Sequence, residues 1–353
     1  MNAGNYVLLV LLVIIVCGTG LADDNTSEDQ AVEAVRKLGG AVTPRVRMPG
    51  EPVVGVDLGN PQITDADLKH LAPLKNLKTL NLRYAKITDA GVRELAGLTK
   101  LAELHLSHTH VTNAGLKGLA PLTGLTTLGL GNTQVTDAGL KELAPLKGLT
   151  RLALWDLKMT GAGLKGLAPL TQLKFLHLDK AKLTDDDLKD LAPLHELTEL
   201  YLAQTQVTGA GLKHLVPLKH LTLLDLSFTT VSDFGLDDLA KFKELTSLSL
   251  DRTKISDAGL KHVATLNKLT GLSLEWTKVT DTGLKELSTL KGLKYLSLSH
   301  TNVTDEGMTA IAQLTNLEFL KLDFTNVTDQ GAATLKKALP KCELMTTNKR
   351  GRE

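Results

Sequence analysis

Cysteine is scarce in this sequence, with Cys17 and Cys342 the two in 353 residues. Cys17 follows an N-terminal apolar run, so removal of that run would leave Cys342 alone and exclude an internal disulfide. A long chain without disulfides needs an extended hydrophobic core for its stability. We therefore expect Cys342 to be a buried thiol rather than a reactive one.

The apolar run from Val7 to Val16 is followed by the small residues Gly20 and Ala22. This order predicts a signal peptide at 1–22, with the mature chain beginning at Asp23. The run is shorter than the roughly 20 residues of a spanning helix, so we expect no membrane insertion after signal removal. No Lys or Arg precedes the run, which leaves an uncleaved anchor as the alternative.

The chain also has no excess of charge, because 40 basic residues balance 39 acidic ones and the formal net charge is +1. Such a balance creates no field that would recruit nucleic acid or an acidic membrane, and we expect neither partner. The sequence contains no G-x-S-x-G, no P-loop, no H-E-x-x-H and no paired cysteines. These absences predict a protein that is not an enzyme and holds no cofactor or metal.

What the sequence does contain is a 24-residue repeat, present in twelve copies over 53–340 without an insertion. The first six positions read L-x-x-L-x-L, which predicts a short strand with one buried face. Position 12 is Thr or Ser in every copy and suits a helix N-cap; an Asp at position 13 would lie in the first helical turn. Leucines three apart follow, and we expect prolines such as Pro145 to end the helix by pushing the preceding residue out of the α region.

Stacked units of strand, turn and helix must curve, because helices are wider than the spacing of about 4.8 Å between strands. The segment GAGLKGLAPL at 161–170 resembles the signature of the bacterial 24-residue GALA class of leucine-rich repeats, and the resemblance covers all twelve copies. It implies an α/β solenoid, a right-handed horseshoe with a parallel sheet on the concave face and short helices on the convex face. Position 9 is Thr in eight copies where many leucine-rich repeats carry Asn, and we expect these hydroxyls to bond the turn backbone.

The segments that flank the repeats are predicted to close the stack. Residues 27–38 begin with a capping candidate, Ser27, and predict a short amphipathic helix within an N-terminal helical cap at 23–52. Residues 341–353 are predicted to form a C-terminal cap and tail, with Leu344 in the register of a thirteenth repeat strand. We expect the tail that ends at Glu353 to be disordered.

A cluster of three histidines, His105, His108 and His110, offers the one candidate for metal chemistry. No cysteine or pair of carboxylates stands nearby to complete a tight coordination shell. We therefore favour a solvated polar surface over a metal site.

Side chains at positions 3, 5, 7 and 8 should point away from the core on the concave face. Nine of the twelve aromatic residues fall in these four columns, far more than an even distribution would give. They suggest two groups, one in repeats five to eight and one in repeats ten to twelve. The predicted ligand-binding residues are Arg151, Trp155, Phe175, His177, Tyr201, Asp225, Phe228, Trp276, Tyr295, Phe319 and Phe324. An alternative is that these rings merely pack against one another across strands.

These features favour an exported recognition scaffold, secreted, periplasmic or on the cell surface, that binds a protein, peptide or glycan on its concave face. We expect a monomer. A second hypothesis, which the resemblance implies, is a substrate-recognition adaptor of a ubiquitin ligase, although residues 23–52 are short for an F-box. A third is a metal-dependent enzyme built on the histidine cluster.

Overall fold

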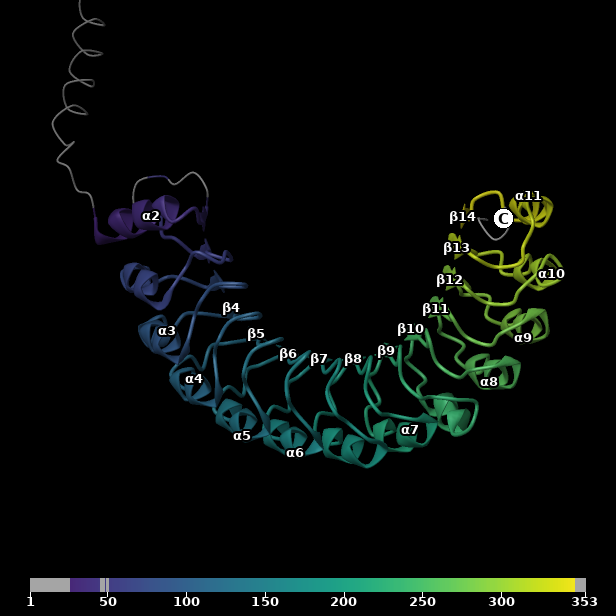
Figure 1. Cartoon of the computed structure of the whole chain (residues 1–353), viewed down its shortest axis with the longest axis horizontal. Coiled ribbons are helices and arrows are strands. Elements are labelled where there is room, and N and C mark those ends of the chain that lie inside the picture. The colour runs from purple at the N-terminus through teal and green to yellow at the C-terminus, as the bar shows by residue number, and fades with distance from the viewer. Residues whose placement is uncertain (1–25, 45–47, 49–50, 347–353) are drawn as a thin grey trace, which may run out of the picture.

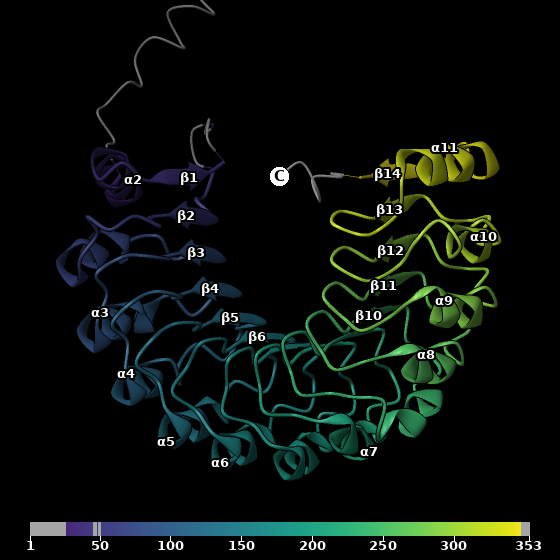
Figure 2. The ribbon, with the colours of Figure 1, turned by 45° about the vertical axis from the view of Figure 1, so that its right-hand side comes forward.

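The computed structural model describes residues 26–44, 48 and 51–346. Figure 1 shows an open arc with strands along the inner rim and helices along the outer rim. Among the described residues one sheet holds 14 strands in chain order, and Figure 2 shows them side by side from β1 to β14. The strands are β1 (Ala41–Thr43), β2 (Gly55–Asp57), β3 (Thr79–Asn81), β4 (Glu103–His105), β5 (Thr127–Gly129), β6 (Arg151–Ala153), β7 (Phe175–His177), β8 (Glu199–Tyr201), β9 (Leu223–Asp225), β10 (Ser247–Ser249), β11 (Gly271–Ser273), β12 (Tyr295–Ser297), β13 (Phe319–Lys321) and β14 (Glu343–Met345).

From β2 onward the strands pair in parallel and in the register of the repeat, so that Leu80 lies beside Leu104 and Leu320 beside Leu344. The predicted strand at Leu344 is therefore confirmed. β1 differs, because it pairs antiparallel with β2 and matches Val42 to Val56. The repeat pattern did not predict β1, which lies outside the 24-residue period.

The convex side carries short helices, many of them 3-10 rather than α. They are α2 (Ser27–Lys37), η1 (Asp65–Leu71), α3 (Asp89–Glu94), η2 (Leu95–Gly97), α4 (Asn113–Gly118), α5 (Asp137–Leu140), η3 (Lys141–Leu143), α6 (Gly161–Leu164), η4 (Lys165–Leu167), η5 (Asp185–Leu191), η6 (Gly209–Gly211), α7 (Leu212–Leu215), η7 (Leu236–Lys241), α8 (Asp257–Val263), α9 (Asp281–Leu287), α10 (Met308–Ile311) and α11 (Asp329–Ala338). An apolar spacing of three explains the 3-10 turns, since these have 3.0 residues per turn. Leu68, Leu71 and Leu74 are spaced in this way and all are buried.

The expected mechanism of helix ending at the prolines is wrong. Ala144, which precedes Pro145, keeps helical angles with φ −53 and ψ −30, and Ala168 before Pro169 does the same. The helices still end there. Proline lacks the N–H that would continue the helix, although the next residue still closes a turn, as Leu146 N does to Leu143 O at 2.9 Å.

The core is a continuous stack of leucines between the sheet and the helices. Thr at position 9 has the predicted structural role. In all eight copies the buried hydroxyl donates to the carbonyl three residues earlier, at 2.6 to 2.8 Å, as Thr109 does to Leu106. Each such bond satisfies a carbonyl of the turn that follows the strand.

A second ladder joins neighbouring repeats on the convex side. The carboxylate at position 13 accepts from the backbone N–H and the hydroxyl at position 12 of the next repeat. Asp281, for example, lies 2.8 Å from Thr304 N and 2.7 Å from Thr304 Oγ1. The same pair of contacts recurs from Asp65, Asp89, Asp137, Asp185, Asp233, Asp257 and Asp305. Position 13 therefore binds adjacent repeats together, beyond its favourable place at a helix N-terminus.

The helix predicted over 27–38 is observed as α2, but its N-cap is Thr26 rather than Ser27. Thr26 Oγ1 accepts from the Asp29 N–H at 3.1 Å, and Asp29 bonds back to Thr26. Burial of Val35 joins α2 to the core of the first repeat. Cys342 is buried, and burial raises the pKa of its thiol. The predicted signal peptide and the tail from 347 lie outside the described residues, and none of the described helices is long and apolar enough to span a membrane.

Candidate functional site

Each repeat presents four side-chain columns to the concave face. The middle residue of every repeat strand is a buried Leu or Val, so positions 3 and 5 on either side of it point outward. Positions 7 and 8 follow in the turn. The concave face is thus an array of columns spaced by the sheet, and its side chains are held on a rigid support.

Position 8 has an unexpected backbone conformation. From repeat two to repeat twelve its φ is positive, between 52 and 65: Tyr84, His108, Asn132, Asp156, Lys180, Gln204, Phe228, Arg252, Trp276, His300 and Phe324. In this conformation its N–H donates to the position-7 carbonyl of the next repeat, as Trp276 N does to Ser299 O at 3.0 Å. The left-handed turn extends the bonding between repeats beyond the strand and turns the position-8 side chain along the rim of the sheet.

The predicted first aromatic group is larger than expected and begins earlier in the chain. His108 stacks on Tyr84 with ring centroids 4.4 Å apart, and its other side meets Trp155 at 5.0 Å. His177 lies 6.4 Å from Trp155 and 5.0 Å from Tyr201. His108 is partly exposed, as a surface residue should be, and in addition it contacts two aromatic rings. We call this set the N-terminal aromatic cluster: Tyr84, His108, Trp155, Phe175, His177 and Tyr201.

Phe228 does not join that cluster, contrary to the grouping suggested by the sequence. The Arg252 guanidinium lies 5.2 Å from the Phe228 ring centroid and 4.3 Å from that of Trp276. Trp276 stacks on His300 at 3.8 Å, and His300 stacks on Phe324 at 4.4 Å. Phe228 therefore starts a ladder of five consecutive position-8 side chains, the C-terminal ladder: Phe228, Arg252, Trp276, His300 and Phe324.

Tyr295 and Phe319 form a separate stacked pair at position 3, with centroids 5.7 Å apart. The ammonium group of Lys321 lies 5.9 Å from the centroid of the Tyr295 ring and places a positive charge next to this pair. The sequence correctly assigned this pair to one column. It missed Arg252, although the position-8 column of repeats eight to twelve reads Phe, Arg, Trp, His, Phe and would have revealed the ladder.

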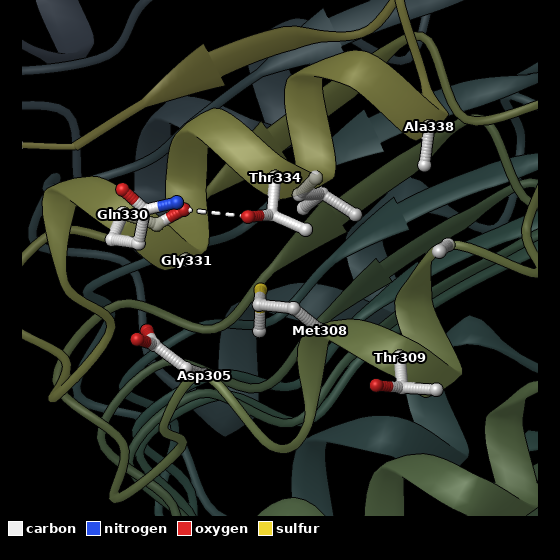
Figure 3. A pocket seen from close by; sticks show the side chains of 9 residues that line it. Asp305, Met308, Thr309, Gln330, Gly331, Thr334 and Ala338 are labelled. Carbon is white, nitrogen blue, oxygen red and sulfur yellow. Dashed lines mark hydrogen bonds between the residues drawn. The ribbon is translucent and has the colours of Figure 1, made fainter.

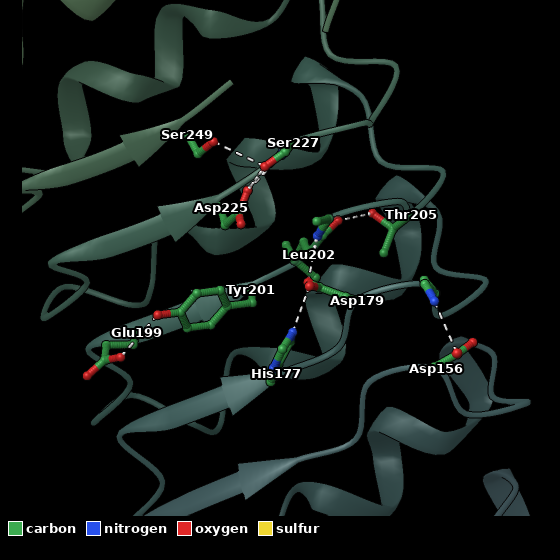
Figure 4. A network of polar contacts seen from close by, with 12 residues as sticks. Asp156, His177, Asp179, Glu199, Tyr201, Leu202, Thr205, Asp225, Ser227 and Ser249 are labelled. Atoms are coloured by element: carbon green, nitrogen blue, oxygen red, sulfur yellow. Dashed lines mark hydrogen bonds and ion pairs between the residues drawn. The ribbon is translucent and has the colours of Figure 1, made fainter. Parts of the chain in front are cut away.

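A polar network lies beside the rings on the middle strands and is drawn in Figure 4. His177 Nε2 is 2.6 Å from Asp179 Oδ2, and the other oxygen of Asp179 accepts from the Ala203 N–H at 2.9 Å. The hydroxyl of Tyr201 donates to Glu199 at 3.4 Å. These contacts fix the orientation of His177 and Tyr201 before any ligand arrives.

The network continues through half-buried carboxylates. Asp225 accepts from the backbone N–H of Ser227 at 2.9 Å and from the hydroxyl of the same residue, which also contacts Ser249. Burial raises the pKa of Asp225, and burial likewise raises the pKa of Asp251 on the next repeat. Asp225 is therefore half-buried beneath the ligand-facing surface rather than freely presented on it.

One cavity of 290 Å³ opens on the concave face between Arg83 and Phe175. Its lining includes three predicted binding residues besides Phe175: Arg151, Trp155 and His177. The other predicted residues, from Tyr201 onward, lie outside it. Arg83 and His105 complete its N-terminal side, and neither was predicted to bind a ligand; Arg83 stands at position 7, one of the four outward columns.

A different cavity, of 320 Å³, lies on the convex side between α10 and α11 (Figure 3). Met308, Ala312 and Leu335 give it an apolar lining, and Thr334 bonds Gln330 within α11 at 2.9 Å. Asp305 at its edge holds Thr328 in the ladder between repeats. Asp305 and Thr334 at this cavity are thus engaged in bonds that hold the last repeat together.

The histidine cluster does not form a ligand set. Arg83 Nη2 lies 3.1 Å from His105 Nδ1, and because guanidinium only donates, that nitrogen must accept. Burial, with the Arg83 charge, lowers the pKa of His105. His108 is stacked in the aromatic cluster. Within the described ranges no group of three His, Cys, Asp or Glu side chains is placed to hold a metal ion.

The fold and the repeated columns define a leucine-rich repeat solenoid. The family model described as "Leucine Rich repeat" matches residues 74–96, 97–120, 265–288 and 293–312. No curated protein sequence matches the chain.

Among the solved structures that resemble the fold are two bacterial proteins. An internalin from Listeria monocytogenes is 23% identical with a TM-score of 0.62, over 92% of this chain and 95% of that one. A leucine-rich repeat protein from Leptospira interrogans is 22% identical with a TM-score of 0.54, over 78% of this chain and 80% of that one. The predicted fold class is confirmed, whereas the narrower GALA-type assignment is not among the matches.

Proposed function

We propose that this chain is a non-enzymatic recognition scaffold that binds a protein or peptide on its concave face. The observation that carries the proposal is the gathering of aromatic and arginine side chains in the four outward columns. Tyr84, Phe228 and Trp276 are exposed on this face by 57%, 48% and 45%. Tryptophan, tyrosine and arginine are the residues that most often dominate binding hot spots. Because the sheet that carries these side chains is preformed, little conformational entropy is lost when they bind a partner.

The ring geometry favours a peptide or protein over the glycan that the sequence also allowed. A sugar binds an aromatic side chain by lying flat on the ring face. In the C-terminal ladder the faces between neighbouring rings are covered, because Trp276 and His300 are 13° from parallel and His300 and Phe324 are 15° from parallel. The ladder therefore offers ring edges to a ligand, and edges suit irregular apolar side chains.

Export is the second part of the proposal and rests on the sequence before Asp23. In this account residues 1–22 direct the chain out of the cytoplasm, and the protein works as a monomer in a secreted, periplasmic or cell-surface location. The domain limits that accompany it are 23–52 for the N-terminal cap, 53–340 for the repeats and 341–353 for the C-terminal cap and tail. N-terminal sequencing of exported material should return Asp23, and intact Met1 in a membrane fraction would contradict cleavage.

A pull-down from native extract tests the binding proposal. The chain from Asp23 is used as bait beside a variant with Trp155→Ala and Tyr201→Ala. We expect a partner that the first bait recovers and the variant loses. Equal recovery by both baits would contradict the assignment of the binding surface.

A further inference from the structure

The concave cavity of 290 Å³ exists because one repeat lacks side chains where its neighbours have them. Position 5 of repeat four is Gly129, where an added Cβ would lie 3.3 Å from both His105 Nδ1 and Ser107 Oγ. Position 7 is Gly131, and a Cβ there would overlap the Trp155 indole. Repeat four therefore forms a floor, and the indole leans over it as a wall.

Two guanidinium groups line this cavity. Arg83 bonds His105 and makes no ion pair with a carboxylate of the described residues. Arg151 lies 4.0 Å above the Phe175 ring and 3.7 Å from Glu199 Oε1, with half of its side chain exposed. The nearby carboxylates of Asp57 and Glu103 line a neighbouring cavity at the N-terminal edge instead. The residues that line the cavity thus include two guanidinium groups and no carboxylate, while Glu199 beside Arg151 and Asp179 beside His177 lie next to it.

We propose that this cavity binds a carboxylate of a peptide ligand, with an apolar ligand side chain beside it. This inference rests on the proposed function and adds the chemical class of the bound group. Guanidinium groups match carboxylates in shape and donate charge-assisted hydrogen bonds to them. Trp155 and Phe175 supply the apolar walls for the residue next to the acid. A carboxylate also relieves the repulsion between two arginines that share one cavity.

The peptide source is favoured over an acidic sugar for a geometric reason. Trp155 packs over Gly131 and meets His108 at 63°, so part of its indole surface is already occupied and a sugar ring has less of it to lie flat on. Phe175 has Arg151 over one face. The remaining ring edges can contact the side chain that flanks an acidic residue.

Tryptophan fluorescence provides the test, because Trp155 and Trp276 are the two tryptophans of the chain. In a Trp276→Phe background Trp155 alone reports on the cavity. Three probes are titrated: acetyl-Leu-Asp-Leu-amide, its Asn analogue, and the Asn analogue with a free C-terminal carboxylate. The first and third carry one carboxylate from a side chain or a terminus, and the second carries none. Sodium glucuronate is the acidic-sugar comparison.

We expect saturable quenching by at least one of the two acidic peptides and at least about tenfold weaker binding of the neutral one. Arg83→Gln or Arg151→Gln should weaken binding of the acidic peptide by about tenfold or more. Arg93→Gln, on the convex helix α3, should leave this affinity unchanged. The better acidic probe identifies the source of the carboxylate.

Several results would overturn the inference: no binding by either acidic peptide, equal binding by the neutral one, or insensitivity to both arginine variants. Tighter binding of glucuronate than of the peptides would overturn the peptide assignment. If these probes fail while the pull-down partner still depends on Trp155 and Tyr201, the carboxylate inference alone is wrong. Loss of that dependence as well would reject the proposed function.

Discussion

At position 8 the stacking of repeats requires a left-handed backbone conformation, which most single residues disfavour. A left-handed backbone costs about 1–2 kcal/mol for a residue other than Gly, and Asn tolerates it best. Phe228 and Trp276 nonetheless adopt φ 57 and 59. Large side chains at such positions indicate that the repeat geometry determines the backbone and that the side chains serve another purpose.

Gln204 allows this cost to be measured, since it has φ 58 with an exposed side chain. Gln204→Asn should raise the free energy of unfolding by about 0.5 kcal/mol, because Asn adopts the left-handed conformation at a lower energetic cost than Gln. Urea denaturation measures the change. Gln134→Asn, at exposed position 10, is the matched control and should give no gain; an equal gain in both variants would contradict the explanation.

Asp225 makes a pH-dependent prediction. Burial raises the pKa of its carboxyl above the unfolded value, so the folded state binds the proton more readily. The contribution of this group to stability is full below about pH 3.9 and is lost as pH rises through the folded pKa. Asp225→Asn mimics the protonated form and keeps an oxygen for Ser227. Its Tm should exceed that of the unaltered protein at pH 7, and the difference should vanish below about pH 4. A lower Tm at pH 7 would contradict this.

At the scale of the element, most helix starts are held in one of two ways, by position 13 of the previous repeat or by an Asp of the same repeat, whereas η7 begins after Gly235 with neither contact. In most repeats the position-13 Asp of the previous repeat binds the capping Thr, and position 15 is Gly because a Cβ would contact that carboxylate. Repeat five has Gly161 at position 13. The next repeat then uses its own Asp187, which closes a capping box on Thr184 at 2.7 to 2.8 Å and fills the space above Gly161.

This alternation predicts a double-mutant cycle. Gly161→Asp alone places a second carboxylate against Asp187 and should destabilise the protein by about 2 kcal/mol or more. Gly161→Asp with Asp187→Gly recreates the arrangement of the other repeats and should recover most of that loss, which gives a large coupling energy in urea denaturation. Additive effects of the two substitutions on the free energy of unfolding would show that an Asp at position 161 cannot replace Asp187 in holding the N-cap.

The elements that recur with the 24-residue period were predicted well from the sequence. Leucine spacing located the strands and the core. Thr or Ser at position 12 located most helix starts, but in repeats eight and eleven the helix begins later, with Gly235 and Gly307 as N-caps. The sequence could not predict β1, because no repeat position corresponds to Val42, nor the 3-10 turns that short helices adopt. The left-handed turn also escaped prediction, since Trp276 and Lys180 at position 8 carry none of the usual signals for it.

The candidate site was predictable by column but not by contact. The sequence identified Trp155, Phe175 and Tyr201 as outward-facing residues. Their partners depend on side-chain direction: Arg252 joins Phe228 to Trp276, and His108 joins Tyr84 to Trp155. Long side chains span adjacent strands, so a column assignment alone cannot tell which neighbours they reach.

For the whole molecule, an open solenoid has two ends that must be closed. α2 and β1 cover the first repeat, with Val35 and Val42 buried against it, and Glu28 Oε1 accepts from Val53 N at 2.7 Å. A chain that starts at Val53 would expose this core and the unpaired edge of β2. We expect a lower Tm and aggregation relative to the chain from Asp23, measured by calorimetry and light scattering. An unchanged Tm with a monomeric mass would reject the capping role.

Binding of a partner by the concave aromatic face can be separated from packing of the rings by measuring affinity and stability together. Trp155→Ala with Tyr201→Ala is compared with the unaltered chain by calorimetric titration against the partner from the pull-down, and the Tm of each is recorded. Phe234→Ala is the control, because Phe234 is 80% exposed and lies outside the four concave columns.

We expect the double variant to lose at least about 2 kcal/mol of binding free energy with little change in Tm, while the control binds normally. A double variant that keeps full affinity but melts earlier would contradict the account: the rings would then be packing elements, and the partner would bind elsewhere.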